Sequence, residues 1–451
     1  MNQESIQYKK IAIAVLIGLF VFALGSLIFT LQQASLVGLI AFLVTLWTNE
    51  GLHLGIVSLL PIILFPAFGV LDTKATAVNY SHPITYLFLG GFLLAIAVEK
   101  TDLHKWIADK ILSFFPSTPR GMIFSLAMTA GLLSAILSNT TTSLLLMGIA
   151  LFITQDLQLK MRFALAIAYG ASVGGIITPI GTPPNLILMG IMSDKGMDVI
   201  PFFQWMWMVF PLALMMFVVV SFLLSFGVPN VKIQRDEHRE PLDKTQKKVL
   251  FLLGSLVFLL FANSPIDPYW SGLGINENGM ILCFGLLLFM PPFNVLDWME
   301  DKIKIPFRIM FLFGAGFAIA KAFGATGLAD EIASYLVALT ELPPILLLFS
   351  IAILVTFTTE ITSNTALISI MLPVIYAVAE QTGIPKTLFM MVATLCASYA
   401  FMLPIATPPN AIAMSSGAVN VKDMIRYGVI LNFVGIFLIV LVAQLFWSNI
   451  L

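Results

Sequence analysis

Long apolar segments recur along the whole chain, and short polar segments separate them. Most of them approach or exceed the ~20 residues that an α-helix needs to cross a bilayer. We therefore predict spanning helices at residues 11–31, 34–49, 52–70, 84–99, 162–192, 200–227, 249–263, 276–292, 304–321, 386–416 and 424–448. The pattern predicts an all-α polytopic membrane protein with about 11 transmembrane helices.

Two further apolar blocks, 119–154 and 343–380, have a different pattern. At ~20 residues per crossing, each is too long for one span and too short for two. Each also carries a polar cluster at its midpoint. A re-entrant helical hairpin enters and leaves on the same side of the membrane, and its non-helical tip is tolerated when it is buried in protein. We predict that both blocks are such hairpins.

The distribution of charge supports this topology. The chain is 59% hydrophobic and only 10% charged, and with an internal N-terminus the cytoplasmic segments hold most of its Lys and Arg, as the positive-inside rule requires. We predict a multi-pass protein of the cell membrane (the inner membrane in a Gram-negative organism) with a cytoplasmic N-terminus and a cytoplasmic linker at 228–248. The net charge of -1 and the absence of a basic patch argue against a nucleic-acid partner.

The sequence contains an internal repeat. The tripeptide SNT at 138–140 recurs at 363–365, and "TPIGTPPNLI" at 178–187 recurs as "LPIATPPNAI" at 403–412, so both pairs are 225 residues apart (363 − 138 and 403 − 178). Five predicted spans lie between the two hairpins, and this odd number turns the second copy upside down. Inverted repeats with broken helices are typical of secondary transporters, whose sites lie at the repeat interface near the midplane.

The TPPN segments predict helix breaks within two of the spans. Paired prolines, Pro183 with Pro184 and Pro408 with Pro409, remove backbone donors and prevent a continuous helix. A simple proline kink is the alternative, but the recurrence at one offset disfavours it. The freed carbonyls and nearby hydroxyls are hard oxygen ligands that suit a small alkali cation, and they belong to Gly181, Ala406, Thr182 and Thr407.

The SNT tips predict the rest of a binding site. At each tip a second helix begins, and its N-terminal amides carry a partial positive charge that suits a carboxylate. Asn139 and Asn364 can turn an oxygen to a cation or an amide to an anion, and Thr140 and Thr365 add hydroxyl donors. Ser134 and Thr359 place one more hydroxyl a turn earlier. The residues Thr141, Thr142 and Ser143 are explained by hydrogen bonds within or between helices.

Charged side chains are scarce in this predicted site. No Lys or Arg occurs at either tip or break, so we expect bound cations and helix dipoles to neutralise an anion, which would couple anion binding to cation binding. Glu360 has two possible roles, a structural anchor for the second hairpin or a group that binds cations or protons. His53 and Lys321 are interpreted as snorkelling residues at helix ends.

These motifs resemble those of the divalent anion/sodium symporters, the family of sodium-coupled dicarboxylate and citrate carriers. The segment "ASYAFMLPIATPPNAIA" at 397–413 is similar to the family signature, with Ala413 where Val is usual. The resemblance implies one sodium site near Ser134, Ser138, Asn139 and Gly181, and a second near Thr359, Thr362, Asn364 and Ala406. It implies that the substrate lies between Asn139, Thr140, Asn364 and Thr365, with Thr182, Thr407 and Pro408 nearby.

The resemblance also implies a domain organisation, a homodimer and an elevator mechanism. The hairpins, the broken helices and the last span would move, while the early helices and residues 200–292 would form the scaffold. The expected segments are N-terminal scaffold helices at 1–83, a first repeat at 84–227 with hairpin 119–154 and broken helix 162–192, the linker 228–248, scaffold helices at 249–303, and a second repeat at 304–451 with hairpin 343–380 and broken helix 386–416.

The predicted function is sodium-coupled uptake of a C4-dicarboxylate such as succinate, malate or fumarate. A dicarboxylate exchanger and a sodium-coupled sulfate or citrate carrier remain as alternatives within the same class, and a channel is a weaker one. The sequence contains no nucleotide-binding, zinc-protease or serine-hydrolase motif, so we do not expect an enzyme. The expected ligands are the dicarboxylate and sodium ions, with membrane lipid around the protein and no organic cofactor.

Overall fold

The computed structural model describes residues 3–228, 241–265, 269–336 and 343–450, and every regular element in these ranges is a helix. Much of the predicted linker, 229–240, lies outside the described residues. Eight of the described helices are long and apolar enough to cross a membrane, namely Ile6–Gly25, Leu31–Asn49, Thr73–Lys100, Phe202–Ser225, Lys244–Asn263, Phe307–Ala325, Asn364–Gln381 and Val421–Asn449. The prediction of an all-α polytopic membrane protein is confirmed.

The offset of 225 residues reappears in the helix boundaries. Helices of the first repeat begin at positions that, shifted by 225, fall at or close to the starts of helices in the second. The first set is α6 (Pro83–Lys100), α7 (Leu103–Leu112), α8 (Pro119–Ser134), α9 (Asn139–Ile153), α10 (Leu157–Gly175), α11 (Pro183–Asp194) and α12 (Phe202–Ser225). The second set is α16 (Phe307–Ala325), α17 (Leu328–Leu336), α18 (Pro344–Thr359), α19 (Asn364–Thr382), α20 (Lys386–Ser398), α21 (Pro408–Ser415) and α22 (Val421–Leu445).

The two predicted hairpins have the expected helix–turn–helix form. Pro119 and Pro344 occupy the first turns of α8 and α18, where a missing backbone donor costs nothing. Ser138 caps the N-terminus of α9, and its hydroxyl accepts a hydrogen bond from the Thr141 amide at 3.1 Å. Each hairpin therefore turns at its SNT tripeptide.

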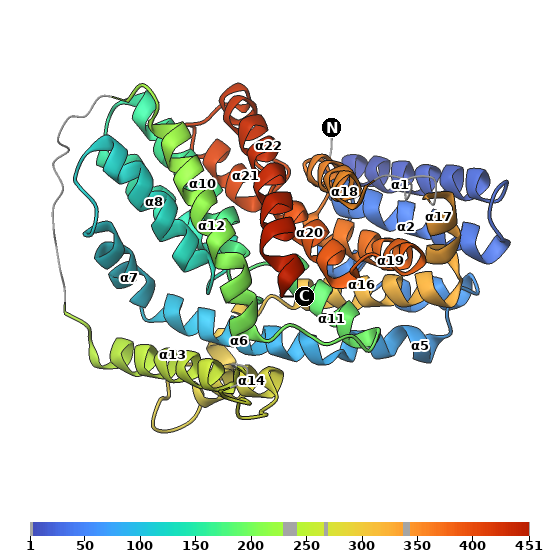
Figure 1. Cartoon of the computed structure of the whole chain (residues 1–451), viewed down its shortest axis with the longest axis horizontal. Coiled ribbons are helices and arrows are strands. Elements are labelled where there is room, and N and C mark those ends of the chain that lie inside the picture. Colours follow the sequence, from blue (N-terminus) through green and yellow to red (C-terminus); the bar gives the residue numbers. More distant parts are fainter. Residues whose placement is uncertain (1–2, 229–240, 266–268, 337–342, 451) are drawn as a thin grey trace.

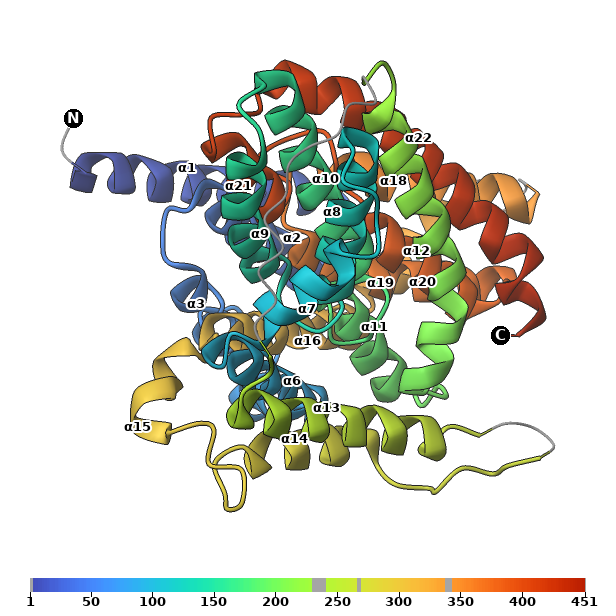
Figure 2. The ribbon, with the colours of Figure 1, turned by 90° about the vertical axis from the view of Figure 1, so that its left-hand side faces the viewer.

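The remaining helices pack around these repeats (Figures 1 and 2). The helices α1 (Gln3–Gly25) and α2 (Leu31–Asn49) lie side by side, while α13 (Lys244–Asn263) and α14 (Glu277–Leu287) pack near α6. Shorter elements connect them, namely α3 (Leu54–Val57), α4 (Pro61–Ala67), α5 (Thr73–Ala77), η1 (Val78–Ser81), α15 (Trp298–Asp301), η2 (Lys302–Lys304) and η4 (Trp447–Asn449).

One detail differs from the sequence-based prediction. The predicted span 52–70 is divided into α3 and α4, because Pro61 starts a new helix and Pro66 lies inside it. The helix α12, whose place in the scaffold stays a prediction from the resemblance, packs against α8, α10 and α22 (Figure 1). Its Trp205 indole donates to the Ile176 carbonyl at 2.9 Å, directly at the first helix break.

Glycines allow α8 and α10 to approach closely. A Cβ atom on Gly174 would lie 2.0 Å from the Gly131 carbonyl oxygen, and one on Gly131 would lie 2.1 Å from the Phe217 ring. Small residues at helix contacts are the usual means of tight packing in membranes. This contact fixes the helix that leads into the first break against the first arm of the hairpin.

We expect Gly174→Val to lower the apparent melting temperature of the purified protein by several degrees, because overpacking a tight core contact costs about 1–3 kcal/mol. Gly254→Val is the matched control, since a Cβ atom at Gly254 has nothing within 4 Å. Differential scanning fluorimetry measures both variants. Equal melting temperatures for Gly174→Val and Gly254→Val would contradict the proposed close contact.

Candidate functional site

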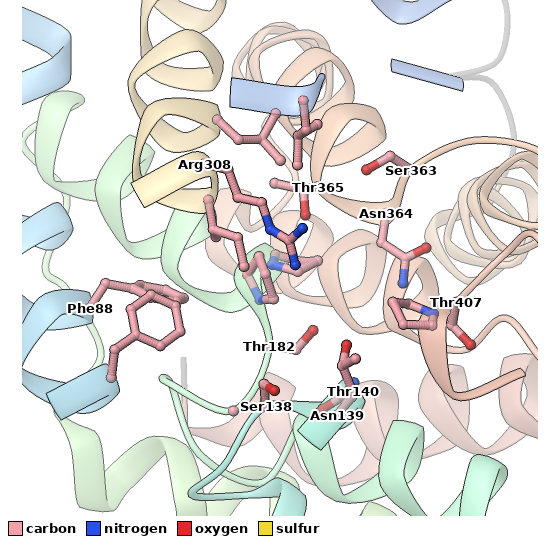
Figure 3. A pocket seen from close by; sticks show the side chains of 18 of the residues that line it. Phe88, Ser138, Asn139, Thr140, Thr182, Arg308, Ser363, Asn364, Thr365 and Thr407 are labelled. Carbon is pink, nitrogen blue, oxygen red and sulfur yellow. The ribbon is translucent and has the colours of Figure 1, made fainter. Parts of the chain in front are cut away.

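A cavity of about 700 Å³ is lined by both hairpin tips and both helix breaks (Figure 3). Segments far apart in the sequence meet here, and each repeat contributes the same two motifs. The lining residues from these motifs are Ser138, Asn139, Thr140, Gly181, Thr182, Pro183, Pro184, Ser363, Asn364, Thr365, Ala406, Thr407 and Pro408. All of the predicted substrate-binding residues therefore line one cavity.

The two tips share one hydrogen-bonding arrangement. Ser134 donates to Asn139 Oδ1 at 2.5 Å, and Thr359 donates to Asn364 Oδ1 at 2.7 Å. In each hairpin the donor lies five residues before the asparagine, and the two pairs are 225 residues apart. Both hairpins therefore place a hydroxyl oxygen beside an amide oxygen at equivalent positions. Ser134 and Thr359 are fully buried behind the cavity wall.

At the second tip, one hydroxyl group lies within hydrogen-bond distance of two acceptor oxygens. Thr359 Oγ1 lies 2.7 Å from Asn364 Oδ1 and 2.9 Å from the Ala397 carbonyl oxygen. A hydroxyl has one proton, so it cannot satisfy both acceptors fully. Three converging neutral oxygens are a ligand set that suits a hard cation. Thr362, by contrast, donates to the Thr358 carbonyl at 2.9 Å and does not line the cavity.

Residues of the first predicted cation site also lie close together. A Cβ atom on Gly181 would lie 2.5 Å from the Gly175 carbonyl oxygen, and one on Gly175 would lie 2.8 Å from Asn139 Oδ1. Gly175 thus allows the first break and the first tip to approach each other. Asn139 and Gly181 both line the cavity there, together with Ser138.

At each break one asparagine side chain donates to two backbone carbonyls, an arrangement that we call the asparagine clamp. Asn185 Nδ2 donates to the carbonyls of Thr178 at 2.9 Å and Gly175 at 3.4 Å. At the shifted positions, Asn410 Nδ2 donates to the carbonyls of Leu403 and Ala400, both at 3.0 Å. Each clamp satisfies carbonyls that lost their helical partners, which broken helices in a membrane require. The Oδ1 atoms of both asparagines are buried and have no hydrogen-bond partner within the described residues.

Glu360 ties the second tip to the second break. Its two carboxylate oxygens accept hydrogen bonds from the amides of Met402 and Leu403, both at 2.9 Å, and from Asn432 Nδ2 at 2.6 Å. In the first repeat the equivalent connection is a hydrogen bond that the Thr178 hydroxyl donates to the Ala135 carbonyl. Ala135 is the position that corresponds to Glu360. The geometry favours the anchor role over the cation-binding role.

Sequence reasoning missed one wall of the cavity. Glu50 and His53, which follow α2, and Arg308 at the start of α16 all line it, as do Trp47 and Phe88. The repeat gave no signal for Arg308, because position 83 is a proline. Among the described residues, no three His, Cys, Asp or Glu side chains come together to hold a metal.

Comparison with known proteins decides the family. The model of the citrate transporter family matches residues 40–384. The chain belongs to this family. Its similarity to the sodium-dependent dicarboxylate transporter SdcS of Staphylococcus saprophyticus is 30% identity over 96% of this chain and 90% of SdcS. The chain is also 29% identical to the Na(+)/citrate cotransporter of Rattus norvegicus, over 86% of each chain.

Solved structures give the same fold. The YdaH transporter of Alcanivorax borkumensis superposes with a TM-score of 0.61 over 83% of this chain and 88% of its own, at 14% sequence identity. The resemblance to the divalent anion/sodium symporters is thereby confirmed for this member of the citrate transporter family. The chain is a transporter and not an enzyme.

We expect Glu360→Gln to lower the apparent melting temperature and the maximal uptake rate. The new amide group would point a donor at backbone amides that need an acceptor, and leaving buried donors unpaired costs about 1–3 kcal/mol each. Scanning fluorimetry and transport assays measure the two effects. A variant with unchanged stability and only a weaker dependence on cation concentration would instead assign Glu360 to cation binding.

Proposed function

We propose that this member of the citrate transporter family is a secondary active transporter in which sodium entry drives uptake of a C4-dicarboxylate such as succinate, malate or fumarate. The observation that carries the proposal is the convergence of both SNT tips and both TPPN breaks on one cavity. The similarity to the sodium-dependent dicarboxylate transporter SdcS and to the rat Na(+)/citrate cotransporter supports sodium-coupled carboxylate transport.

Sodium ions would bind at the two oxygen clusters. In this proposal the first site comprises Ser134, Ser138, Asn139 and Gly181, and the second comprises Thr359, Thr362, Asn364 and Ala406. The hydroxyl–amide contacts at 2.5 and 2.7 Å support the pairing of Ser134 with Asn139 and of Thr359 with Asn364. Thr362 would contribute through its backbone, because its hydroxyl is already bonded to Thr358.

The dicarboxylate would bind between the tips. The N-termini of α9 and α19 bring backbone amides and the positive ends of two helix dipoles to the cavity. Side chains of Asn139, Thr140, Asn364 and Thr365 would donate to its carboxylates, with Thr182, Thr407 and Pro408 beside them. Sodium bound behind each tip would lower the cost of holding an anion in an apolar surrounding, and this is the physical basis of coupling.

Transport would follow an elevator movement within a homodimer in the cell membrane, with the N-terminus in the cytoplasm. The moving unit would contain the two hairpins, the broken helices α10–α11 and α20–α21, and α22. The contacts of α12 with α8, α10 and α22 favour its inclusion in this unit. The helices before residue 84 and those at 249–303 would form the scaffold.

We expect Asn139→Ala and Asn364→Ala each to abolish sodium-dependent succinate uptake while expression and the oligomeric state stay unchanged. Each substitution removes one oxygen ligand for sodium and one donor for the carboxylate. Ser143→Ala is the matched control, because Ser143 is buried in α9 and does not line the cavity. Uptake at the wild-type rate in both Asn variants would refute the site.

The function is tested by uptake of radiolabelled succinate into proteoliposomes, with and without a sodium gradient and with and without internal dicarboxylate. Sodium-driven accumulation into empty vesicles supports symport. Uptake that needs internal substrate indicates an exchanger, and competition by citrate or sulfate alone identifies a carrier for that anion. Non-saturating flux would indicate a channel.

A further inference from the structure

One cationic side chain reaches the proposed binding cavity. Arg308 lies in the first turn of α16 and lines the cavity together with the hairpin tips. Figure 3 shows its guanidinium group directed away from α16 into the cavity, where the labelled polar side chains of the tips and breaks also lie. The cavity therefore combines neutral donors on the tips with a fixed positive charge on α16.

Arg308 has no protein partner that explains its presence. Within the described residues it forms no hydrogen bond or ion pair, and its side chain is exposed. Glu50 lines the same cavity, but among the described residues it forms no ion pair with Arg308. Two other arginines are used structurally, since Arg120 donates to the Val228 carbonyl and Arg162 to the carbonyls at the end of α12.

The position of Arg308 is also unfavourable for its own helix. It is the second residue of α16, next to the positive end of the helix dipole, where a cation is destabilising. Neither capping nor a local ion pair offsets this cost. A residue that breaks a local rule without compensation is expected at a functional site, and a bound anion would be attracted by both the guanidinium and the helix end.

We propose that Arg308 binds a carboxylate of the transported anion in this conformation and selects anions with at least two carboxylates over monocarboxylates. The inference rests on the proposed function, because it concerns the ligand of the same cavity. One carboxylate would meet the amides and hydroxyls of the tips. The other would meet the guanidinium group, whose planar fork matches the two oxygens of a carboxylate.

The test is equilibrium binding of succinate to the purified full-length protein in sodium chloride, measured by isothermal titration calorimetry. We expect Arg308→Gln to raise the Kd for succinate about 10–100-fold, as loss of a charged hydrogen bond predicts. The Kd of Arg308→Lys should lie between those of the wild type and Arg308→Gln, because lysine keeps the positive charge but lacks the planar guanidinium group. The affinity for butyrate, which has the same number of carbons but one carboxylate, should be weak and nearly unchanged.

Arg426→Gln is the matched control. Arg426 is an exposed arginine near the start of α22, it does not line the cavity, and we expect wild-type binding for this variant. Thermal stabilisation by sodium alone, which should persist in Arg308→Gln, verifies that the variant is folded and keeps its cation sites. A Kd within twofold of wild type for a folded Arg308→Gln would overturn the inference.

Failure of the inference and failure of the proposed function are distinguishable. If the wild type binds citrate or sulfate but not succinate, the C4-dicarboxylate proposal fails, and the same Arg308 variants are compared with the anion that binds. If Arg308→Gln binds as wild type while sodium-driven uptake is normal, only the inference fails. If no anion binds to the wild type in sodium, both fail.

Discussion

The cavity at the repeat interface depends on two segments, 176–182 and 399–407, that lack helical hydrogen bonds in the interior of a membrane protein. Hydrocarbon offers no substitute partners, so each freed backbone group must find one within the protein or a cavity. The Thr178 and Leu403 carbonyls illustrate the solution, since each accepts one bond from a backbone amide three residues later and one from an asparagine clamp. The carbonyls and amides that remain are those available to ligands.

The two repeats meet this requirement by different chemistry. A hydroxyl-to-carbonyl bond, Thr178 to Ala135, connects tip and break in the first repeat, whereas a buried carboxylate with three donors does so in the second. A carboxylate that accepts several hydrogen bonds holds its donors strongly. It also requires every donor to stay in place, because an unpaired buried polar group is costly. Asn432 brings α22 into this network, and Glu360 therefore couples the second hairpin to two other parts of the chain, the second break and α22.

The motifs at the tips and breaks could be predicted from the sequence because they are local and repeated. Prolines force a break wherever the chain folds, and one offset paired SNT with SNT and TPPN with TPPN before any contact was known. The predicted hairpin 119–154 corresponds to α8 and α9, which begin at Pro119 and end at Ile153. Pro61 and Pro66 indicate the division of span 52–70, but the apolar composition of this segment favours one continuous helix.

What the sequence could not predict is the long-range packing. Arg308 stands in an ordinary basic cluster with Lys302 and Lys304, and only the packing of α16 beside α3 brings it to the cavity. The hydrogen bonds of Asn185 to the Thr178 and Gly175 carbonyls could not be predicted either, since TPPN indicates a helix break but not which side chain bonds the freed carbonyls. Hydrophobic periodicity specifies which face of a helix is buried, not which distant residue it meets.

The separation of charge from the tips has a consequence for coupling. The tips and breaks carry only neutral candidate ligands, so in the proposed mechanism an anion bound there would depend on cations bound behind them, while Arg308 belongs to α16. If α16 stays with the scaffold while the hairpins move in the proposed elevator, the anion would leave the guanidinium group and be balanced by sodium alone in the other conformation. The fixed charge would then favour the conformation described here for the bound anion, and release of sodium would be the step that weakens binding. Coupling in such a carrier therefore depends on which charges move with the substrate and which stay behind.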